Sequence, residues 1–336
     1  MHQPTQLSIY IKPPLHLTPF KPHANADEIM DRVTEWSRKA LVPFYPSEKE
    51  LNVYLSHQIG YWAIFCYPSV DEQKLFLFIL LNQWIFALDD LMMRVGPAND
   101  ILDAVNAILH DQKLANQPPI TIPFEETWSQ MLSLGMAAGP KSRIVEATEE
   151  MAEGFREEAI LRARGNYTRE EIVEMRYKSC GLKTCTAFLE YGLGMDLSPE
   201  FASHPSLDLM CNLAVEHMLY WHEILAFRKE YFSDDVMNIV SASAGEELCD
   251  LQQSVNSAYA HACQAETRFV SLREELLAGE LGSNPEIHRF LAEVGQVIAG
   301  ALQFEFWCKR YHGHVWNGKY SGHFILTPEK TIFPTE

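Results

Sequence analysis

Apolar side chains recur every three or four residues along most of this chain, which is the spacing of α-helices that bury one face. The pattern predicts helices at 26–42, 51–67, 98–111, 124–136, 141–164 and 206–231, with two or three more between 234 and 311. Capping boxes are expected where Asn25, Ser47 and Thr168 are each followed three residues later by glutamate. Asp71 can cap a further helix, which carries the apolar segment Leu75–Leu88.

Strand-like alternation of apolar and polar residues is nearly absent, and no long repeat is visible. No internal linker is long enough to separate two domains. Residues 1–24 are rich in proline, which fixes φ and removes a backbone donor, so we expect an extended N-terminal arm there. Residues 25–336 are expected to form a single all-α domain of about ten to twelve helices.

Composition and charge exclude several classes of protein. A formal charge of −18 and a pI near 5.1 argue against nucleic acid or an anionic membrane as a partner. The N-terminus lacks the apolar region of a signal peptide, and the longest apolar run, broken by Asn82 and Gln83, is expected to be too short to span a bilayer. The 7 cysteines are scattered without a CxxC pair, as in proteins with reduced thiols. We therefore expect a cytoplasmic protein.

Two adjacent carboxylates, Asp89 and Asp90, follow the apolar segment Leu75–Leu88 directly. Burying a charge is costly unless it is paired or binds a metal ion. The pair therefore marks either a helix end that faces solvent or a site that holds a cation, and the segment alone leaves both interpretations open.

A second polar segment, from His222 to Glu230, reads HEILAFRKE. His222, Ala226 and Glu230 are spaced four residues apart, so they share one side of two helical turns, with Lys229 beside them. The alternative interpretation is a solvated run of charges on the helix surface.

Together the two segments resemble the metal-binding motifs of class I terpene synthases, especially fungal ones. Asp89-Asp90-Leu-Met-Met93 matches the first two positions of a DDxxD motif, and Met93 replaces its last acidic residue. The segment His222–Glu230 matches the frame of the (N/D)DxxSxxxE motif, with His in place of Asn and Ala226 in place of Ser. The resemblance implies a class I terpenoid synthase-like helical bundle.

Two further positions fit the same family. Its members carry a diphosphate-sensing Arg about 46 residues ahead of the second motif, and Arg176 lies 222 − 176 = 46 residues ahead of His222. Gly181 stands where the helix that carries this arginine is normally broken in the family. Arg310-Tyr311 matches the family's C-terminal Arg-Tyr pair. A competing register, in which Asn238, Ala242 and Glu246 form the second motif, loses both the spacing to Arg176 and the Arg-Lys-Glu ending, so we prefer His222.

The resemblance implies that Mg²⁺, up to three ions with Mn²⁺ as an alternative, binds a substrate diphosphate. The implied metal ligands are Asp89, Asp90, His222 and Glu230, and Asp90 is also expected to pair with Arg310. The implied diphosphate-binding residues are Arg176, Lys229, Arg310 and Tyr311, and the catalytic ones are Asp89, Asp90, Arg176 and Glu230. Side chains expected to line the pocket for the carbocation are Phe65, Phe86, Met218 and Trp307, with Trp62. Because His222 is a poor Mg²⁺ ligand and Ala226 lacks a hydroxyl, weakened metal affinity is expected.

The resemblance implies a sesquiterpene synthase that ionises and cyclises farnesyl diphosphate. A humulene-type product is expected on resemblance alone, and the enzyme is expected to be a monomer or a homodimer. A non-catalytic helical binding or scaffold protein is the alternative that His222 and Ala226 favour. A chain-elongating prenyltransferase is disfavoured, because such enzymes carry two Asp-rich motifs and this chain has one.

Overall fold

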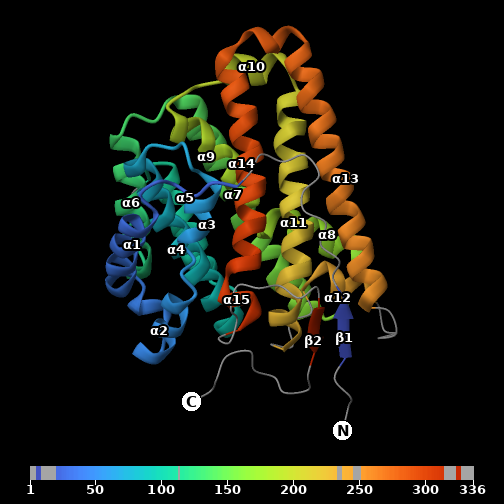
Figure 1. Ribbon diagram of the computed structural model, residues 1–336. Coiled ribbons are helices and arrows are strands. Elements are labelled where there is room, and N and C mark those ends of the chain that lie inside the picture. Colours follow the sequence, from blue (N-terminus) through green and yellow to red (C-terminus); the bar gives the residue numbers. More distant parts are fainter. Residues whose placement is uncertain are drawn as a thin grey trace.

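The computed structural model describes residues 5–8, 20–112, 114–232, 237–244, 251–313 and 323–326 (Figure 1). Its α-helices are α1 (Ala26–Ala40), α2 (Glu48–Ser56), α3 (Tyr61–Cys66), α4 (Glu72–Val95), α5 (Asn99–Leu109), α6 (Ile122–Ser133), α7 (Ala138–Arg164), α8 (Arg169–Ser179), α9 (Leu182–Leu193), α10 (Ser198–Ser203), α11 (Ser206–Phe232), α12 (Ile239–Ala244), α13 (Leu251–Ala278), α14 (Pro285–Trp307) and α15 (Lys309–His312). The all-α class is confirmed, and the short helices α10, α12 and α15 extend the predicted set.

Side-chain caps are present at the starts of three helices where they were predicted. The hydroxyl of Ser47 accepts the backbone N–H of Glu50 at α2. Thr168 and Glu171 form a complete capping box at α8, and the Asp71 carboxylate accepts the backbone N–H groups of Gln73 and Lys74 at α4. The capping box expected at Asn25 is wrong, because the Asn25 side chain instead donates to Glu72.

The helix expected at 51–67 is divided in two. α2 ends at Ser56 and α3 begins at Tyr61. Between them Gln58 adopts a φ of 52°, which ends a right-handed helix. Gly60 passes so close to α1 that an added Cβ would lie 2.8 Å from the sulfur of Met30. The backbone therefore turns to let α3 pack under α1, which residue periodicity does not reveal.

α4 is the apolar centre of one half of the molecule. Contrary to expectation, its 24 residues are long and apolar enough to cross a membrane by length and composition alone. However, 56% of its most apolar window is buried inside the protein, as in the core helix of a folded domain. Trp84 is enclosed by Phe44 and Phe124, with ring centroids 5.7 and 5.0 Å away.

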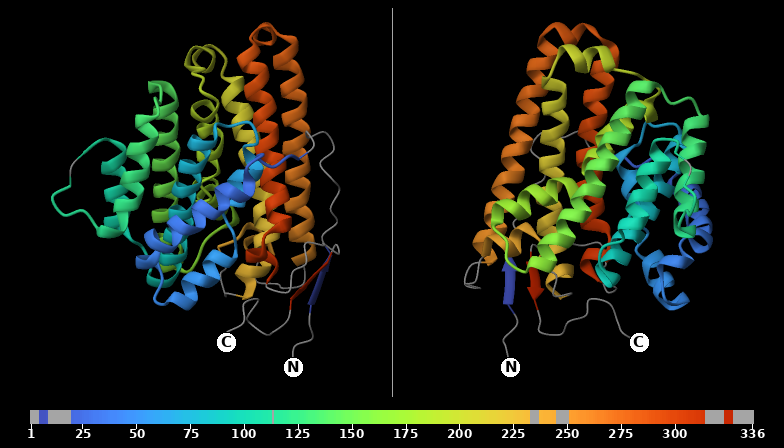
Figure 2. Two further views of the ribbon diagram at one scale, coloured as in Figure 1. Left: turned by 60° about the vertical axis from the view of Figure 1, so that its left-hand side comes forward. Right: turned by 180° about the vertical axis from the view of Figure 1, so that it is seen from behind.

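The long helices α11, α13 and α14 stand side by side in the other half of the molecule, as the views in Figures 1 and 2 show. α12, α15 and a short antiparallel ribbon lie at one end of this bundle, and α10 lies at the opposite end. The ribbon pairs β1 (Thr5–Ser8) with β2 (His323–Leu326), in the register Thr5 to Leu326. Apart from Thr5–Ser8 and residues 20–24, the predicted arm at 1–24 lies outside the described residues.

Candidate active site

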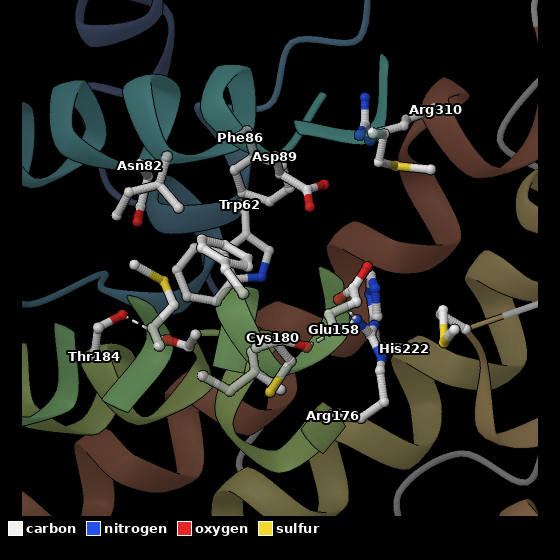
Figure 3. Close-up of a pocket in the computed structure, with 18 of the residues that line it drawn as sticks. Trp62, Asn82, Phe86, Asp89, Glu158, Arg176, Cys180, Thr184, His222 and Arg310 are labelled. Atoms are coloured by element: carbon white, nitrogen blue, oxygen red, sulfur yellow. Dashed lines mark hydrogen bonds and ion pairs between the residues drawn. The ribbon is translucent and has the colours of Figure 1, made fainter. Parts of the chain in front are cut away.

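A cavity opens between α3, α4, α7, α8, α9, α11, α14 and α15 (Figure 3). Residues from distant parts of the chain that were expected at one site all line it: Phe86, Asp89, Arg176, His222, Lys229, Glu230, Arg310, Tyr311 and Trp62. In Figure 3, Asp89 projects from one side of the cavity, and Arg176, Glu158 and His222 lie on the facing side. The cavity therefore has two polar walls, one from α4 and one that α11 shares with α8.

Asp89 is the carboxylate of the α4 wall that faces the cavity. Its side chain makes no hydrogen bond or ion pair with any other residue that the structure describes. Burial raises the pKa of Asp89, and the nearby charges of Glu158 and Asp90 raise it further. A carboxylate in this setting is stabilised by any cation that enters the cavity.

Asp90, by contrast, is committed to the protein. Its Oδ1 lies 2.7 Å from Nη2 of Arg310, and its Oδ2 accepts a hydrogen bond of 3.2 Å from the hydroxyl of Tyr45. Burial alone would raise the pKa of Asp90, but the guanidinium of Arg310 outweighs it and lowers the pKa overall. Asp90 does not line the cavity, and its effect there is to hold Arg310 at the wall.

The α11 wall carries two buried glutamates. Glu230 is only 6% exposed and lines the cavity, and burial raises its pKa. Glu223 is fully buried and receives Nε and Nη2 of Arg176, at 2.8 and 2.7 Å. This pair holds the guanidinium of Arg176 at the cavity surface, opposite Asp89 (Figure 3).

His222 occupies the position where the family motif has an amide. Its Nδ1 lies 2.8 Å from Oε1 of Glu305 on α14, and the ring of Tyr311 packs edge-on at 5.7 Å. Burial lowers the pKa of His222, but the charge and hydrogen bond of Glu305 outweigh it and raise the pKa overall. Ala226, one turn further along α11, is fully buried in the core and does not line the cavity.

Three residues expected in the pocket lie elsewhere. Phe65 packs on Phe20 and on Trp307, with ring centroids 4.8 and 5.7 Å away. Trp307 lies three residues before Arg310, a spacing that would put both on one side of a continuous helix. However, α14 ends at Trp307, and Cys308 is extended before α15 begins. Met218 lies behind the wall, beside a smaller cavity that does not include Asp89.

Sequence reasoning missed two carboxylates that line the cavity. Glu158 follows Met151 and Phe155 at seven and three residues, so these cavity-lining side chains share one stripe of α7. This stripe could have been recognised in the sequence, because an apolar helix face that ends in a glutamate is typical of a site lining. Glu305 gave a second signal, since it is the one charged residue in the last turns of α14.

The residues of the cavity fit a hard divalent cation in part. Within the described ranges, no group of three or more His, Cys, Asp or Glu side chains forms a ready metal cage. The carboxylates of Asp89 and Glu230 nevertheless face the same cavity from separate helices, and oxygen ligands of this kind suit Mg²⁺, which keeps several waters. Arg176, Lys229 and Arg310 line the same space and can contact an anion.

An all-α fold with acidic and basic side chains around one apolar-backed cavity defines a class I terpenoid synthase type of protein. The crystal structure of an α-eudesmol synthase has this fold, with a TM-score of 0.73 at 18% sequence identity over 88% of this chain and 98% of that one.

Residues 81–268, more than half of the chain, match the family model described as terpene synthase family 2, C-terminal metal binding. The chain belongs to this family. It is 23% identical to Sesquiterpene synthase 1 of Postia placenta over 274 residues, covering 80% of each chain. It is also 23% identical to Microbial Terpene synthase-like protein 13 of Selaginella moellendorffii over 318 residues, 90% of this chain and 88% of that one. The protein is thus a class I terpene synthase, a family that uses divalent metal ions.

Proposed function

We propose that this protein is a Mg²⁺-dependent sesquiterpene synthase that converts farnesyl diphosphate to a cyclic hydrocarbon. One observation carries the proposal: Asp89 and Glu230 face the same cavity from separate helices, among Arg176, Lys229 and Arg310. Bound there, Mg²⁺ would supply positive charge to the leaving diphosphate. The Postia placenta relative is named a sesquiterpene synthase, which supports a substrate of this chain length.

In the proposed reaction the C1–O bond breaks and its electron pair leaves with the diphosphate. Arg176, Lys229 and Arg310 stabilise that anion, and Arg176 and Arg310 are held in place by Glu223 and Asp90. The distal double bond then attacks C1 of the allylic cation, and loss of a proton yields the hydrocarbon. C1–C11 closure to a humulene-type ring is the product we propose.

The apolar part of the cavity receives the carbocation. Trp62, Ile85 and Phe86 line it on the side of α3 and α4, and Phe155 and Leu182 line it from α7 and α9. Trp62 and Phe86 supply aromatic rings to this lining, and contact of a cation with the face of such a ring is worth about 0.5–2 kcal/mol. Because these side chains exclude water, the cation survives long enough to cyclise.

Incubation of the purified protein with farnesyl diphosphate, with Mg²⁺ or with a chelator, tests the proposal by gas chromatography and mass spectrometry of the volatiles. We expect a C15 hydrocarbon that requires Mg²⁺, and none from the C10 or C20 diphosphates at comparable rate. The absence of any metal-dependent hydrocarbon from all three diphosphates would overturn the activity. A C15 product with a different ring would overturn only the humulene-type assignment.

We further propose a cytoplasmic enzyme, monomeric or homodimeric, that acts without membrane or nucleic acid and in which residues 25–336 form one domain. The six cysteines among the described residues are free thiols, which supports a reducing compartment.

A further inference from the structure

Asn238, which follows α11 and precedes α12, is fully buried beneath the acidic wall of the cavity. Its side-chain Nδ2 donates to Oε2 of Glu230 at 2.7 Å and to the backbone carbonyl of Glu223 at 2.9 Å. Both contacts reach back across eight and fifteen residues to α11. Asn238 does not line the cavity, so it contacts the wall from behind.

The orientation of this amide is fixed by a third hydrogen bond. Oδ1 of Asn238 accepts the backbone N–H of Val240 at 2.7 Å. An amide has two N–H donors and one carbonyl acceptor, and a flipped amide would turn its oxygen toward the carboxylate of Glu230. The backbone N–H of Val240 therefore selects the orientation in which Asn238 donates to Glu230.

The next residue ties the same segment to the other glutamate of the wall. The backbone N–H of Ile239 donates to Oε2 of Glu223 at 2.6 Å, while Oε1 of Glu223 accepts Nε and Nη2 of Arg176. Two consecutive residues thus hold Glu230, which faces the cavity, and Glu223, which holds Arg176. The start of α12 therefore contacts both the carboxylate of Glu230 and the glutamate that holds the guanidinium of Arg176.

We propose that Asn238 is a positioning residue that holds the carboxylate of Glu230 in the cavity-facing rotamer that would bind a divalent cation. The inference rests on the metal role of Glu230 in the proposed function. A buried carboxylate keeps one rotamer when a fixed donor of the protein holds it, and Nδ2 of Asn238 is that donor. The competing register that would make Asn238 itself a metal ligand is disfavoured, because its Oδ1, the atom that would bind a metal ion, accepts the backbone N–H of Val240 and the side chain does not line the cavity.

The test measures binding of Mg²⁺ in the presence of inorganic diphosphate by isothermal titration calorimetry on the full-length protein. We expect Asn238→Ala to weaken Mg²⁺ binding about tenfold or more, since loss of a group that orients a metal ligand typically costs 10- to 100-fold in affinity. Asn238→Asp keeps the acceptor for the N–H of Val240 but loses the donor to Glu230, so we expect a comparable loss. Thermal unfolding without ligand shows that each variant is folded.

Two controls separate this inference from the proposed function. Ser243→Ala removes the contact of α12 with Nε of Arg169 and should leave Mg²⁺ binding unchanged. Glu230→Ala should lose most of the binding, and wild-type affinity in that variant would contradict the metal role itself. Weak binding in Glu230→Ala with normal binding in Asn238→Asp would overturn only the positioning role, because the donor to Glu230 would then be dispensable. The Asp variant decides the question if the Ala variant does not fold.

Discussion

The two polar walls of the cavity are built in opposite ways. On the α4 wall, Asp89 has no hydrogen-bond or ion-pair partner among the described residues, and its neighbour Asp90 is bound to Arg310. On the α11 wall, each acidic or imidazole group has a partner within the protein: Glu223 binds Arg176, Glu230 accepts from Asn238, and His222 contacts Glu305. One wall exposes a single unpaired carboxylate, and the other is organised before any ligand arrives.

This difference assigns separate tasks to the walls. An unpaired, partly buried carboxylate beside Glu158 is destabilised until a cation approaches, so Asp89 is the group whose energy changes most on metal binding. The carboxylate of Glu230 is already oriented, so its contribution is geometry. We therefore expect substitutions on the α4 wall to remove activity, and those behind the α11 wall to act through position and pH.

The largest effect is expected from Asp89→Asn. The change keeps the shape of the side chain but removes the charge that draws a cation, so kcat/KM with farnesyl diphosphate should fall on the order of 10³-fold. Steady-state release of diphosphate measures it, with Asp100→Asn, at an exposed position of α5, as the matched control. Activity close to that of the control would show that Asp89 does not serve the metal.

The next largest effect is a loss of folding stability when Arg310, the ion-pair partner of Asp90, is replaced. Arg310→Met removes the guanidinium partner of the partly buried carboxylate of Asp90 and leaves the hydroxyl of Tyr45 in contact with it, which should cost about 3–5 kcal/mol of unfolding free energy. Urea denaturation measures the loss. The double variant Asp90→Asn/Arg310→Met should recover part of it, and a double variant as unstable as Arg310→Met would contradict the pairing.

A smaller, pH-dependent effect is expected behind the α11 wall. The pKa of His222 is raised in the folded state by Glu305, so the pair stabilises the protein fully below about pH 6.5, the unfolded value, and less as pH rises through the folded pKa. Glu305→Gln should therefore cost about 1–2 kcal/mol at pH 6 and less at pH 9.

Urea denaturation at several pH values measures this difference, with Glu274→Gln on the exposed face of α13 as the control. A destabilisation that grows with pH would mean that Glu305 does not interact with a protonated His222.

The smallest effect is expected from Met93→Ala, at the position where the family motif has its last acidic residue. Met93 lines the cavity but is 39% exposed, so the change should alter kcat/KM by no more than about threefold. Rates measured beside those of Asp89→Asn place the two positions on one scale. A loss as large as that of Asp89→Asn would show that the α4 wall needs more than one position.

Local patterns predicted most of the helices and several residues of both walls. Thr168 with Glu171 marked the start of α8, and the apolar run marked α4, because helix caps and periodicity are local properties. The break at Gln58 was missed, since it results from the packing of α3 against α1. Trp307 was misplaced for a similar reason, as helical counting fails across the end of α14.

The pairing of Asp90 with Arg310 was predicted from the family resemblance and is confirmed, but the partners of Glu230 and His222 were not predicted, because they join residues that lie apart in the chain. Glu305 lies 83 residues from His222, and nothing in either segment indicates that they meet. Asn238 was considered only as an alternative metal ligand, because the sequence gives the residue type but not the direction in which the side-chain amide points. Long-range contacts that fix direction, and not residue type, are what the structure adds.

The most direct test of the two-wall account is a crystal structure of the protein with Mn²⁺ and inorganic diphosphate, with anomalous scattering used to locate the metal. We expect Mn²⁺ in contact with the carboxylate of Asp89 on one wall and with that of Glu230 on the other, while Asp90 stays bound to Arg310. Mn²⁺ bound to Asp90 with Arg310 displaced, or absent from both Asp89 and Glu230, would contradict it.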